Sequence, residues 1–439
     1  MLIFLREFFY FENNVFFVSS YMLAMLITIA GFFRYWQKTS EEKKLLLPLI
    51  IIFLIGVLHF GIGQYNLYKD IWYFSKPVFY IGAGMLIAYS GLKKNAFLGI
   101  IVYVSFALAL VHLYAFILEP ELLSESINDI RQTAGGGNLL IVFSAAYISR
   151  RRRFEQIKNF LNIPIWVFLL ILYASLLLSF SRTLLIIYLI TMFFLESFYK
   201  RKYAVKLIGL LIFIIISFFT ASFIFPGLFA EGTKSGELKE KLQNSLTEIS
   251  IHERYDSDSE IALNWRGYET SLAVEEIKEG TILNKLFGYG FGKTIYIGNT
   301  DYLGYDILDI PLLHNGFMEI TLKTGFVGLL FYLVFFWNAA RIAVRNNEKS
   351  PDEANLLLSI LTSCFLATLV ITGYYNKSVF DSPCIITGYL LSWIIINKVN
   401  VVSIKRPTAG QRNIHRDKHS ISIKTAPKNK THRFNAVDA

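Results

Sequence analysis

Long apolar segments separated by short polar ones run along most of this chain. A helix of about 20 residues crosses the hydrocarbon core of a bilayer, and many of the apolar segments approach that length. Eleven of them lie near residues 15–33, 45–62, 71–90, 96–118, 133–149, 163–180, 183–198, 204–225, 315–338, 355–374 and 380–397. The pattern predicts an all-α, polytopic integral membrane protein with about eleven transmembrane helices, within a range of about 10–12.

The composition supports this class and excludes a single soluble core. Hydrophobic residues make up 54% of the 439 residues, charged residues make up 17%, and the mean hydropathy is +0.46. Such values are typical of polytopic membrane proteins. The formal net charge is +10, but the segment from Lys398 onward alone holds ten Lys and Arg residues against two Asp. The basic character therefore belongs to the C-terminal tail, and we expect no nucleic-acid partner.

Lys and Arg in the connections predict how the spans are oriented, because basic connections tend to stay on the cytoplasmic side. Basic residues gather in alternate connections, at 34–44, 91–95, 150–158, 200–206 and 341–349. The remaining connections therefore face outward, at 63–70, 119–131, 179–183, 226–313 and near Lys377. This alternation holds from residue 34 to the end of the chain, which supports the expected number of spans there.

The predicted orientation divides the chain into N-terminal transmembrane helices (1–225), one large outward loop (226–313), C-terminal transmembrane helices (314–397) and a basic cytoplasmic tail (398–439) that we expect to be disordered. The loop carries fifteen acidic and eight basic residues. Its apolar residues recur at helical spacing from Leu238 to Ile249 and again from Ala262 to Ile277, which predicts a mainly helical loop. The run GYGFGK, from Gly288 to Lys293, predicts a turn because it lacks the spacing of a phosphate-binding loop.

Ionisable side chains are costly near a bilayer and therefore tend to mark function. By the predicted orientation, the outer face and the outward loops hold His59, Lys76, His112, Arg131, Arg182, Arg266 and His314. A transporter places polar groups near the middle of the bilayer, usually between repeated, broken helices. The chain shows neither an internal repeat nor a pair of broken spans. The pattern therefore favours a reaction site that opens outward, with a transporter or scaffold as the alternative.

His314 is the sharpest of these candidates because it lies where the long outward loop meets the next span. It directly precedes Asn315 and Gly316, and Glu319 follows on the same expected helix. A histidine at a helix start can simply act as a cap or an interfacial residue. The alternative is a general base that takes a proton from a hydroxyl group, a role that histidine commonly has in enzymes.

Two arginines face the same side as this histidine. Arg182, in SFSRT, lies at the tight joint between two spans, where it either reaches lipid headgroups or offers a fixed cation to an anionic substrate. Arg266 lies in the acidic loop, where it either pairs with Glu269 one helical turn on or has the same substrate-binding role. The loop has one other arginine, Arg254, and Arg131 lies in another outward connection.

The other chemically distinctive residues have simpler interpretations. His59 and His112 stand among apolar residues and are expected to be structural. Lys76 precedes Pro77 and is expected to anchor the chain at the interface, with substrate binding as the alternative. Cys364 and Cys384 lie in apolar segments without metal-ligand spacing, so we expect small buried side chains, with a disulfide as the less favoured alternative. No metal motif is present in the sequence.

A motif around His314 resembles that of a known family. The pair of His314 and Asn315, nine residues, Gly325, two residues and Gly328 resembles the H[NSQ]-x9-GxxG signature of the bacterial O-antigen ligase and polymerase superfamily. The run GYGFGK is similar to the Gly-x-Gly turn that precedes the histidine in that family. The order of the motifs, the multispan frame and the single large loop also match. The resemblance covers about residues 130–400.

The arginines extend the resemblance. SFSRT, which contains Arg182, is similar to the Ser-Arg element between spans in this family, and WRGYE, which contains Arg266, is similar to its loop arginine. One departure is Thr270, which stands where the family often has an aromatic residue four positions after the loop arginine. This departure leaves Arg254 as an alternative to Arg266 in the alignment.

The resemblance implies glycosyl transfer at the periplasmic face of the bacterial inner membrane. The donor would be a glycan on undecaprenyl pyrophosphate, with no nucleotide sugar, cofactor or metal. Arg182 and Arg266 would bind the pyrophosphate and stabilise its charge as it leaves, and His314 would orient or deprotonate the acceptor hydroxyl. The further candidate substrate-binding residues are Arg254, Asn315, Glu319, Arg131 and Lys76.

The acceptor separates the members of this superfamily. A ligase would use lipid A-core, whereas a polymerase would use a growing glycan. We place the ligase first because the spacing after His314 is that of the ligase signature. A glycolipid transporter or scaffold is the alternative from another class. The partners implied are the lipid bilayer, a flippase that delivers the lipid-linked glycan and a chain-length regulator.

Overall fold

The computed structural model describes residues 14–35, 40–58, 66–123, 126–135, 137–157, 162–196, 260–261, 264–297, 309–371 and 380–404, together with residues 236, 239 and 255. The described chain is mostly helical, so the predicted all-α class is confirmed. Residues Met1–Ile396 form one compact unit, and Asn397–Ala439 form a second. The first unit includes the residues of the predicted N-terminal helices and of the predicted outward loop. The predicted disorder of the tail stays a prediction, because residues 405–439 lie outside the described ones.

The N-terminal half of the described chain contains nine α-helices and a short 3-10 helix. Their bounds are α2 Asn14–Tyr35, α3 Ser40–Leu58, α4 Asn66–Tyr89, α5 Lys94–Leu118, η2 Pro120–Leu123, α6 Ile127–Thr133, α7 Leu139–Ile148, α8 Arg151–Glu155, α9 Ile165–Leu178 and α10 Arg182–Leu195. The predicted span near 204–225 lies outside the described residues. Of the predicted loop helix from Leu238 to Ile249, only residue 239 is described.

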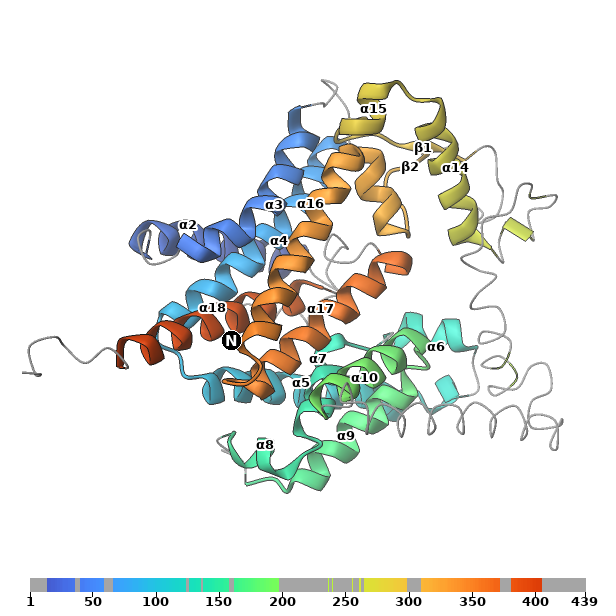
Figure 1. Ribbon diagram of the computed structural model, residues 1–439. Helices are drawn as coiled ribbons and strands as arrows, with labels where there is room; N and C mark the ends of the chain where they lie inside the picture. Colours follow the sequence, from blue (N-terminus) through green and yellow to red (C-terminus); the bar gives the residue numbers. More distant parts are fainter. Residues whose placement is uncertain are drawn as a thin grey trace, which may run out of the picture. The chain divides into compact units, whose positions relative to one another are not determined.

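The C-terminal half holds the elements that surround the candidate site. Their bounds are α14 Trp265–Glu279, α15 Ile282–Phe287, β1 Ile295–Tyr296, β2 Asp309–Ile310, α16 Gly316–Asn346, α17 Pro351–Ile371 and α18 Asp381–Ile404. Figure 1 shows α14, α15 and the two strands gathered beside α16. Helix α14 confirms that the stretch predicted as helical from Ala262 to Ile277 is largely a helix, but its buried residues Gly267, Glu269, Thr270 and Ala273 do not form an apolar face. The antiparallel pair of β1 and β2 was not predicted, because strands of two residues leave no periodic pattern.

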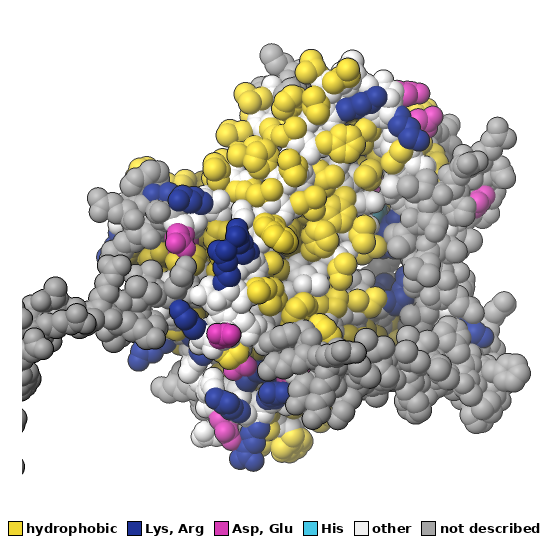
Figure 2. Space-filling view, viewed as in Figure 1, with side chains coloured by type: hydrophobic (Ala, Val, Ile, Leu, Met, Phe, Trp, Pro, Cys, Tyr) yellow, Lys and Arg dark blue, Asp and Glu magenta, His cyan; other side chains and the backbone are white. Residues whose placement is uncertain are grey.

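Five helices of the described chain are long and apolar enough to cross a membrane, namely α2, α4, α5, α16 and α17. The side of the molecule on which α16 lies has a broad face of hydrophobic side chains, as Figure 2 shows. Phe326, Leu330 and Trp337 of α16 are exposed large hydrophobic residues. These features, together with the composition, indicate a membrane protein.

The prediction of about eleven full-length spans is not confirmed, because three of the apolar segments form short helices. Helix α7 has 10 residues, and α9 and α10 have 14 residues each. At 1.5 Å per residue these helices are about 15–21 Å long, short of a hydrocarbon core of about 30 Å. Asn138 caps the start of α7, and Phe180 follows α9 with a φ of 46°. The chain therefore leaves the helical conformation inside the apolar segments.

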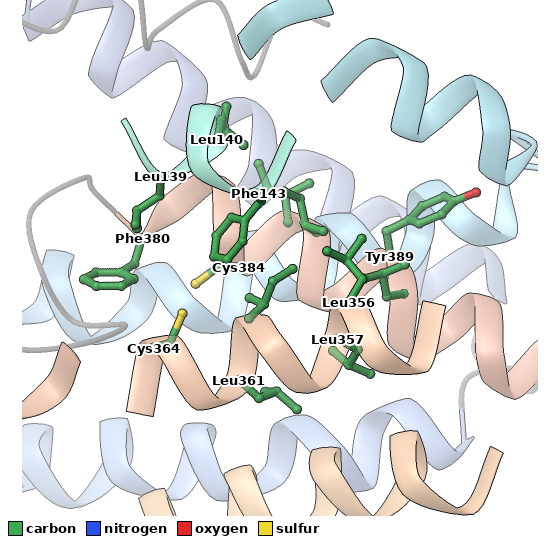
Figure 3. Close-up of a cluster of buried hydrophobic side chains, with 14 of the residues drawn as sticks. Leu139, Leu140, Phe143, Leu356, Leu357, Leu361, Cys364, Phe380, Cys384 and Tyr389 are labelled. Atoms are coloured by element: carbon green, nitrogen blue, oxygen red, sulfur yellow. The ribbon is translucent and has the colours of Figure 1, made fainter. Parts of the chain in front are cut away.

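Helices from both ends of the sequence share one apolar core. Helix α16 packs against α3 and α17, α10 packs against α17, and α2 packs against α4. Cys364 of α17 and Cys384 of α18 lie in this core, and Figure 3 shows their side chains directed toward each other among Leu361, Phe143 and Phe380. Both cysteines are buried, which confirms the prediction of small buried side chains.

The backbone of α16 breaks at Gly325, which has a φ of 68° and a ψ of −174°. Residues 316–324 therefore form a short first part of the helix and residues 326–346 a long second part. A Cβ atom at Gly325 would collide with the backbone of Leu286 and Phe287 at the end of α15. The predicted span at 315–338 lies within α16, which is long and apolar enough to cross a membrane. The break within it is possible because this glycine permits both a left-handed backbone and a close approach of two segments of the chain.

The predicted turn at GYGFGK is confirmed. Gly288, Gly290 and Gly292 all have φ between 78° and 91°. The backbone N–H groups of Tyr289 and Gly290 donate to the carbonyl oxygens of Leu322 and Lys323 at 2.8 and 3.0 Å. The turn thus supplies hydrogen bonds to the end of the first part of α16, where the helix break leaves carbonyl groups without helical partners.

Candidate functional site

A pair of His314 and Glu269 forms the centre of the candidate site. His314 Nδ1 lies 2.9 Å from Glu269 Oε2 and 3.0 Å from Oε1, and the backbone N–H of His314 donates to Oε2 at 2.9 Å. The His314 side chain is 47% exposed, whereas that of Glu269 is 2% exposed. A carboxylate only accepts hydrogen bonds, so this contact assigns a proton to Nδ1 of His314 and leaves Nε2 as an acceptor in the neutral ring.

Helix α14 carries both Glu269 and Arg266, one turn apart. Arg266 is half-buried, and its carbonyl oxygen accepts a hydrogen bond from the Thr270 hydroxyl at 2.7 Å. Both Glu269 oxygens lie within hydrogen-bond distance of His314. The buried carboxylate of Glu269 therefore has His314 as a partner. Arg254, the alternative loop arginine, lies outside the described residues.

Asn315 lies between His314 and the first residue of α16, and its side chain caps that helix. Its side-chain oxygen accepts hydrogen bonds from the backbone N–H groups of Phe317 at 3.1 Å and Met318 at 3.3 Å. Its own backbone is extended, with φ of −80° and ψ of 102°. Asn315 therefore acts as the N-cap of the helix, a role in which Asn is strongly favoured.

Glu319 lies beneath this helix start and is almost fully buried, with a side chain that is 1% exposed. Its Oε2 atom accepts a hydrogen bond from the backbone N–H of Leu313 at 2.9 Å, and its Oε1 atom lies 3.1 Å from the Lys323 ammonium group. In this conformation Glu319 contacts the protein chain and holds the residue next to His314. This placement favours an indirect role over the direct substrate binding that the sequence analysis allowed.

A second cluster lies at the tight joint between α9 and α10. Arg182 is the first residue of α10, and Ser181 caps that helix by accepting a hydrogen bond from the Leu184 N–H. Arg131 of α6 reaches the same joint, where its Nε atom donates to the carbonyl oxygen of Ser179 at 3.4 Å. Two arginines separated in sequence are thus attached to one joint. Helix α10 begins at Arg182, and helix α16 begins directly after Asn315. Both helices pack against α17.

Lys76 is not at an interface, contrary to the interpretation as an anchor. Its side chain and that of Asp381, the first residue of α18, are both 0% exposed, and the two charged groups lie 3.0 Å apart. Lys76 also lies over the ring of Tyr73. The pattern of the sequence could not show this contact, because Lys76 and Asp381 come from opposite ends of the chain.

His112 is placed as expected for a structural residue. It is 7% exposed, and its Nδ1 atom lies 2.9 Å from the Ser175 hydroxyl of α9. His59 lies outside the described residues. Among the residues that the structure does describe, no group of three or more His, Cys, Asp or Glu side chains is placed to hold a metal ion. Independence of metal remains a prediction.

Glu269 is a candidate functional residue that was not identified from the sequence. It was considered only as a partner of Arg266, because the two residues are close in sequence. Its contact with His314 spans 45 positions and leaves no local signal. Lys323 and Asp70 were missed for the same reason, since they form an ion pair across 253 positions.

Comparison with known proteins supports the resemblance that the motifs indicate. Residues 166–333 match the family model described as O-Antigen ligase. The matched segment contains Arg182, Arg266, Glu269 and His314, and hence both members of the central pair. No curated protein matches the chain. Residues 166–333 are thus similar to the O-antigen ligase family, which confirms the predicted resemblance to the O-antigen ligase and polymerase superfamily.

Proposed function

We propose that this protein is a membrane glycosyltransferase that moves a glycan from undecaprenyl pyrophosphate to an acceptor hydroxyl group at the periplasmic face of the bacterial inner membrane. The observation that carries this proposal is the pair of His314 and Glu269, with Arg266 one turn away on α14, inside the segment that matches the O-antigen ligase family. The acceptor of a ligase is lipid A-core.

His314 acts as the general base in this proposal. Glu269 holds the Nδ1 proton, so Nε2 is free to take the proton of the acceptor hydroxyl. The acceptor oxygen then attacks the anomeric carbon of the donor, and the bond from that carbon to the pyrophosphate oxygen breaks with its electron pair on the leaving group. The buried carboxylate of Glu269 stabilises the imidazolium that forms, as an acidic partner does in other catalytic pairs. The 47% exposure of His314 gives the acceptor access.

Arg182 and Arg266 stabilise the charge on the leaving pyrophosphate. A guanidinium group presents a planar fork of donors that matches phosphate oxygens, so two such groups can neutralise a pyrophosphate without a divalent cation. Arg182 begins a helix of 14 residues, whose N-terminus adds partial positive charge. Arg131 at the same joint and Arg254 of the loop are the further cations that we propose for donor binding.

The remaining candidate residues support the site indirectly. Asn315 caps the helix that follows His314. Glu319 and Lys76 are buried, so we propose that they affect substrate binding indirectly, by positioning the residues that they contact. The function also calls for a flippase that delivers the lipid-linked glycan and a chain-length regulator, which we retain as proposed partners.

A polymerase would use the same donor chemistry, and the lipopolysaccharide of a deletion strain separates the two functions. A ligase predicts loss of all O-antigen together with accumulation of lipid-linked polymer. A polymerase predicts a single repeat unit on the core. Unchanged lipopolysaccharide and other surface glycans would contradict both, and accumulation of lipid-linked glycan on the cytoplasmic side would indicate a transporter.

The location of the site is tested by reporter fusions. Fusions at Glu119, Ser181 and Asp258 should all report the periplasm, because these positions fall in the connections that the charge pattern places outside. A cytoplasmic signal at Ser181 would separate Arg182 from the proposed site and contradict the mechanism.

A further inference from the structure

We propose that Lys323 is a positioning residue for His314, and that it acts by holding the backbone segment that carries this base. The inference rests on the proposed function, because it concerns how the base of that reaction is oriented. Lys323 lies in the first part of α16, and its side chain is 0% exposed. No motif in the sequence marks Lys323, and it takes no part in the proton transfer proposed for His314.

The ammonium group of Lys323 has three oxygen atoms around it. It donates to Asp70 Oδ2 at 2.5 Å and to the carbonyl oxygen of Pro311 at 2.8 Å, and it lies 3.1 Å from Glu319 Oε1. Two of the three ammonium donors thus make hydrogen bonds, and the contact with Glu319 is an ion pair. The side chains of Asp70 and Glu319 are each 1% exposed. Water therefore cannot replace any of these contacts without a change in packing.

Two of these contacts reach the segment that ends at His314. Lys323 donates a hydrogen bond to the carbonyl oxygen of Pro311. Glu319, which forms an ion pair with Lys323, accepts a hydrogen bond from the Leu313 N–H at 2.9 Å. The next N–H along the chain, that of His314, is held by Glu269 at 2.9 Å. Successive backbone groups before and at the base are thus held by three buried charged side chains. A segment held in this way presents the imidazole ring in one position, which general-base catalysis requires.

The glycine turn fixes Lys323 from the other side. The Gly292 N–H donates to the same Asp70 oxygen that binds Lys323, at 2.7 Å, and the Gly290 N–H donates to the carbonyl oxygen of Lys323 at 3.0 Å. A Cβ atom at Gly288 would collide with the backbone of Lys323 and Thr324. The turn, α4 and α16 therefore meet at Lys323, which joins them to the loop that carries His314.

The test uses the full-length protein in nanodiscs, with a glycan on undecaprenyl pyrophosphate as donor and lipid A-core as acceptor. In Lys323→Met, kcat should fall on the order of 10- to 100-fold, the loss typical when a supporting residue of a catalytic group is removed. The KM for the donor should remain within about 2-fold, because Arg182 and Arg266 are unchanged. Tyr332→Phe is the matched control, since it removes a buried hydrogen bond to Thr368 in the second part of the same helix. It should leave both constants unchanged.

A neutral triple variant separates positioning from simple stability. Lys323→Met alone leaves two carboxylates buried together, which is destabilising. The combination of Lys323→Met with Asp70→Asn and Glu319→Gln removes those charges. The proposal predicts that thermal stability recovers in the triple variant while kcat stays low. Recovery of kcat together with stability would overturn the proposal.

Hydrogen exchange of the wild-type protein gives a result that depends on no variant. The Leu313 and His314 amides should exchange at least as slowly as the first-turn amides of α16, because buried carboxylates hold them. Rapid exchange of either amide would overturn the proposal. The outcome is also distinct from failure of the proposed function. An active His314→Ala protein would contradict the function, whereas an inactive His314→Ala protein beside a fully active Lys323→Met protein would contradict only the present inference.

Discussion

The substitution Glu269→Gln tests the contact on which the proposed chemistry depends. Glutamine keeps the shape of the side chain, and its carbonyl oxygen can still accept the hydrogen bonds from His314. It lacks the negative charge that stabilises the imidazolium. A hydrogen bond to a charged group contributes about 1.5–3 kcal/mol, and 1.36 kcal/mol corresponds to a tenfold change in rate. At a carboxylate that is only 2% exposed, we therefore expect kcat to fall about 10- to 150-fold.

The assay measures transfer of glycan from undecaprenyl pyrophosphate to lipid A-core by protein reconstituted in nanodiscs. The KM for the donor should change little, because Glu269 is proposed to contact the base and not the pyrophosphate. Glu275→Gln is the matched control, since it makes the same chemical change at an exposed position of the same helix. Its kcat should equal that of the wild-type protein.

One result would refute this reasoning. If Glu269→Gln transfers glycan at the wild-type rate while His314→Ala is inactive, then the charge of Glu269 plays no part in the reaction. The contact would then serve only to hold the loop. A parallel loss in Glu275→Gln would instead show that the acidic surface of α14, and not the buried carboxylate, determines the rate.

Three further changes test the surrounding structure. Arg182→Lys should lower kcat at least tenfold with normal membrane insertion, because lysine lacks the bidentate fork; unchanged transfer would exclude Arg182 from the site. Gly325→Ala should lower the melting temperature in nanodiscs more than Gly91→Ala, since both have positive φ but only Gly325 is against backbone; equal losses would contradict this. Lys76→Met should destabilise by about 3–5 kcal/mol, and adding Asp381→Asn should restore stability; a destabilised double variant would contradict the buried pair.

Much of the fold follows from local patterns, and the deviations have identifiable physical causes. The apolar segments predicted the membrane class, and apolar spacing predicted the helix that became α14. Short helices such as α7 were not predicted, because an apolar segment does not show where a cap such as Asn138 begins the helix. At Gly325 the backbone passes so close to the end of α15 that a Cβ atom would collide with it, and only the folded chain reveals this contact.

The candidate site was predicted in its residue types but not in its connections. His314 and Arg266 could be identified because each lies in a short motif. Glu269 lies in one of those motifs, yet its partner is far along the chain. Lys323 and Asp70 are still farther apart, and nothing in either local sequence marks them as a pair. The described helices consequently hold more buried ionisable groups than the hydropathy pattern indicated.

The central claim is that His314 is the base of a glycosyl transfer from undecaprenyl pyrophosphate, and a single reconstituted reaction tests it most directly. Wild-type protein, purified donor and lipid A-core should yield glycosylated lipid A-core and free undecaprenyl pyrophosphate in equal amounts. His314→Ala protein at the same level should yield neither. Transfer at the wild-type rate by His314→Ala, or no transfer by folded wild-type protein with any lipid-linked donor and acceptor pair, would contradict the account.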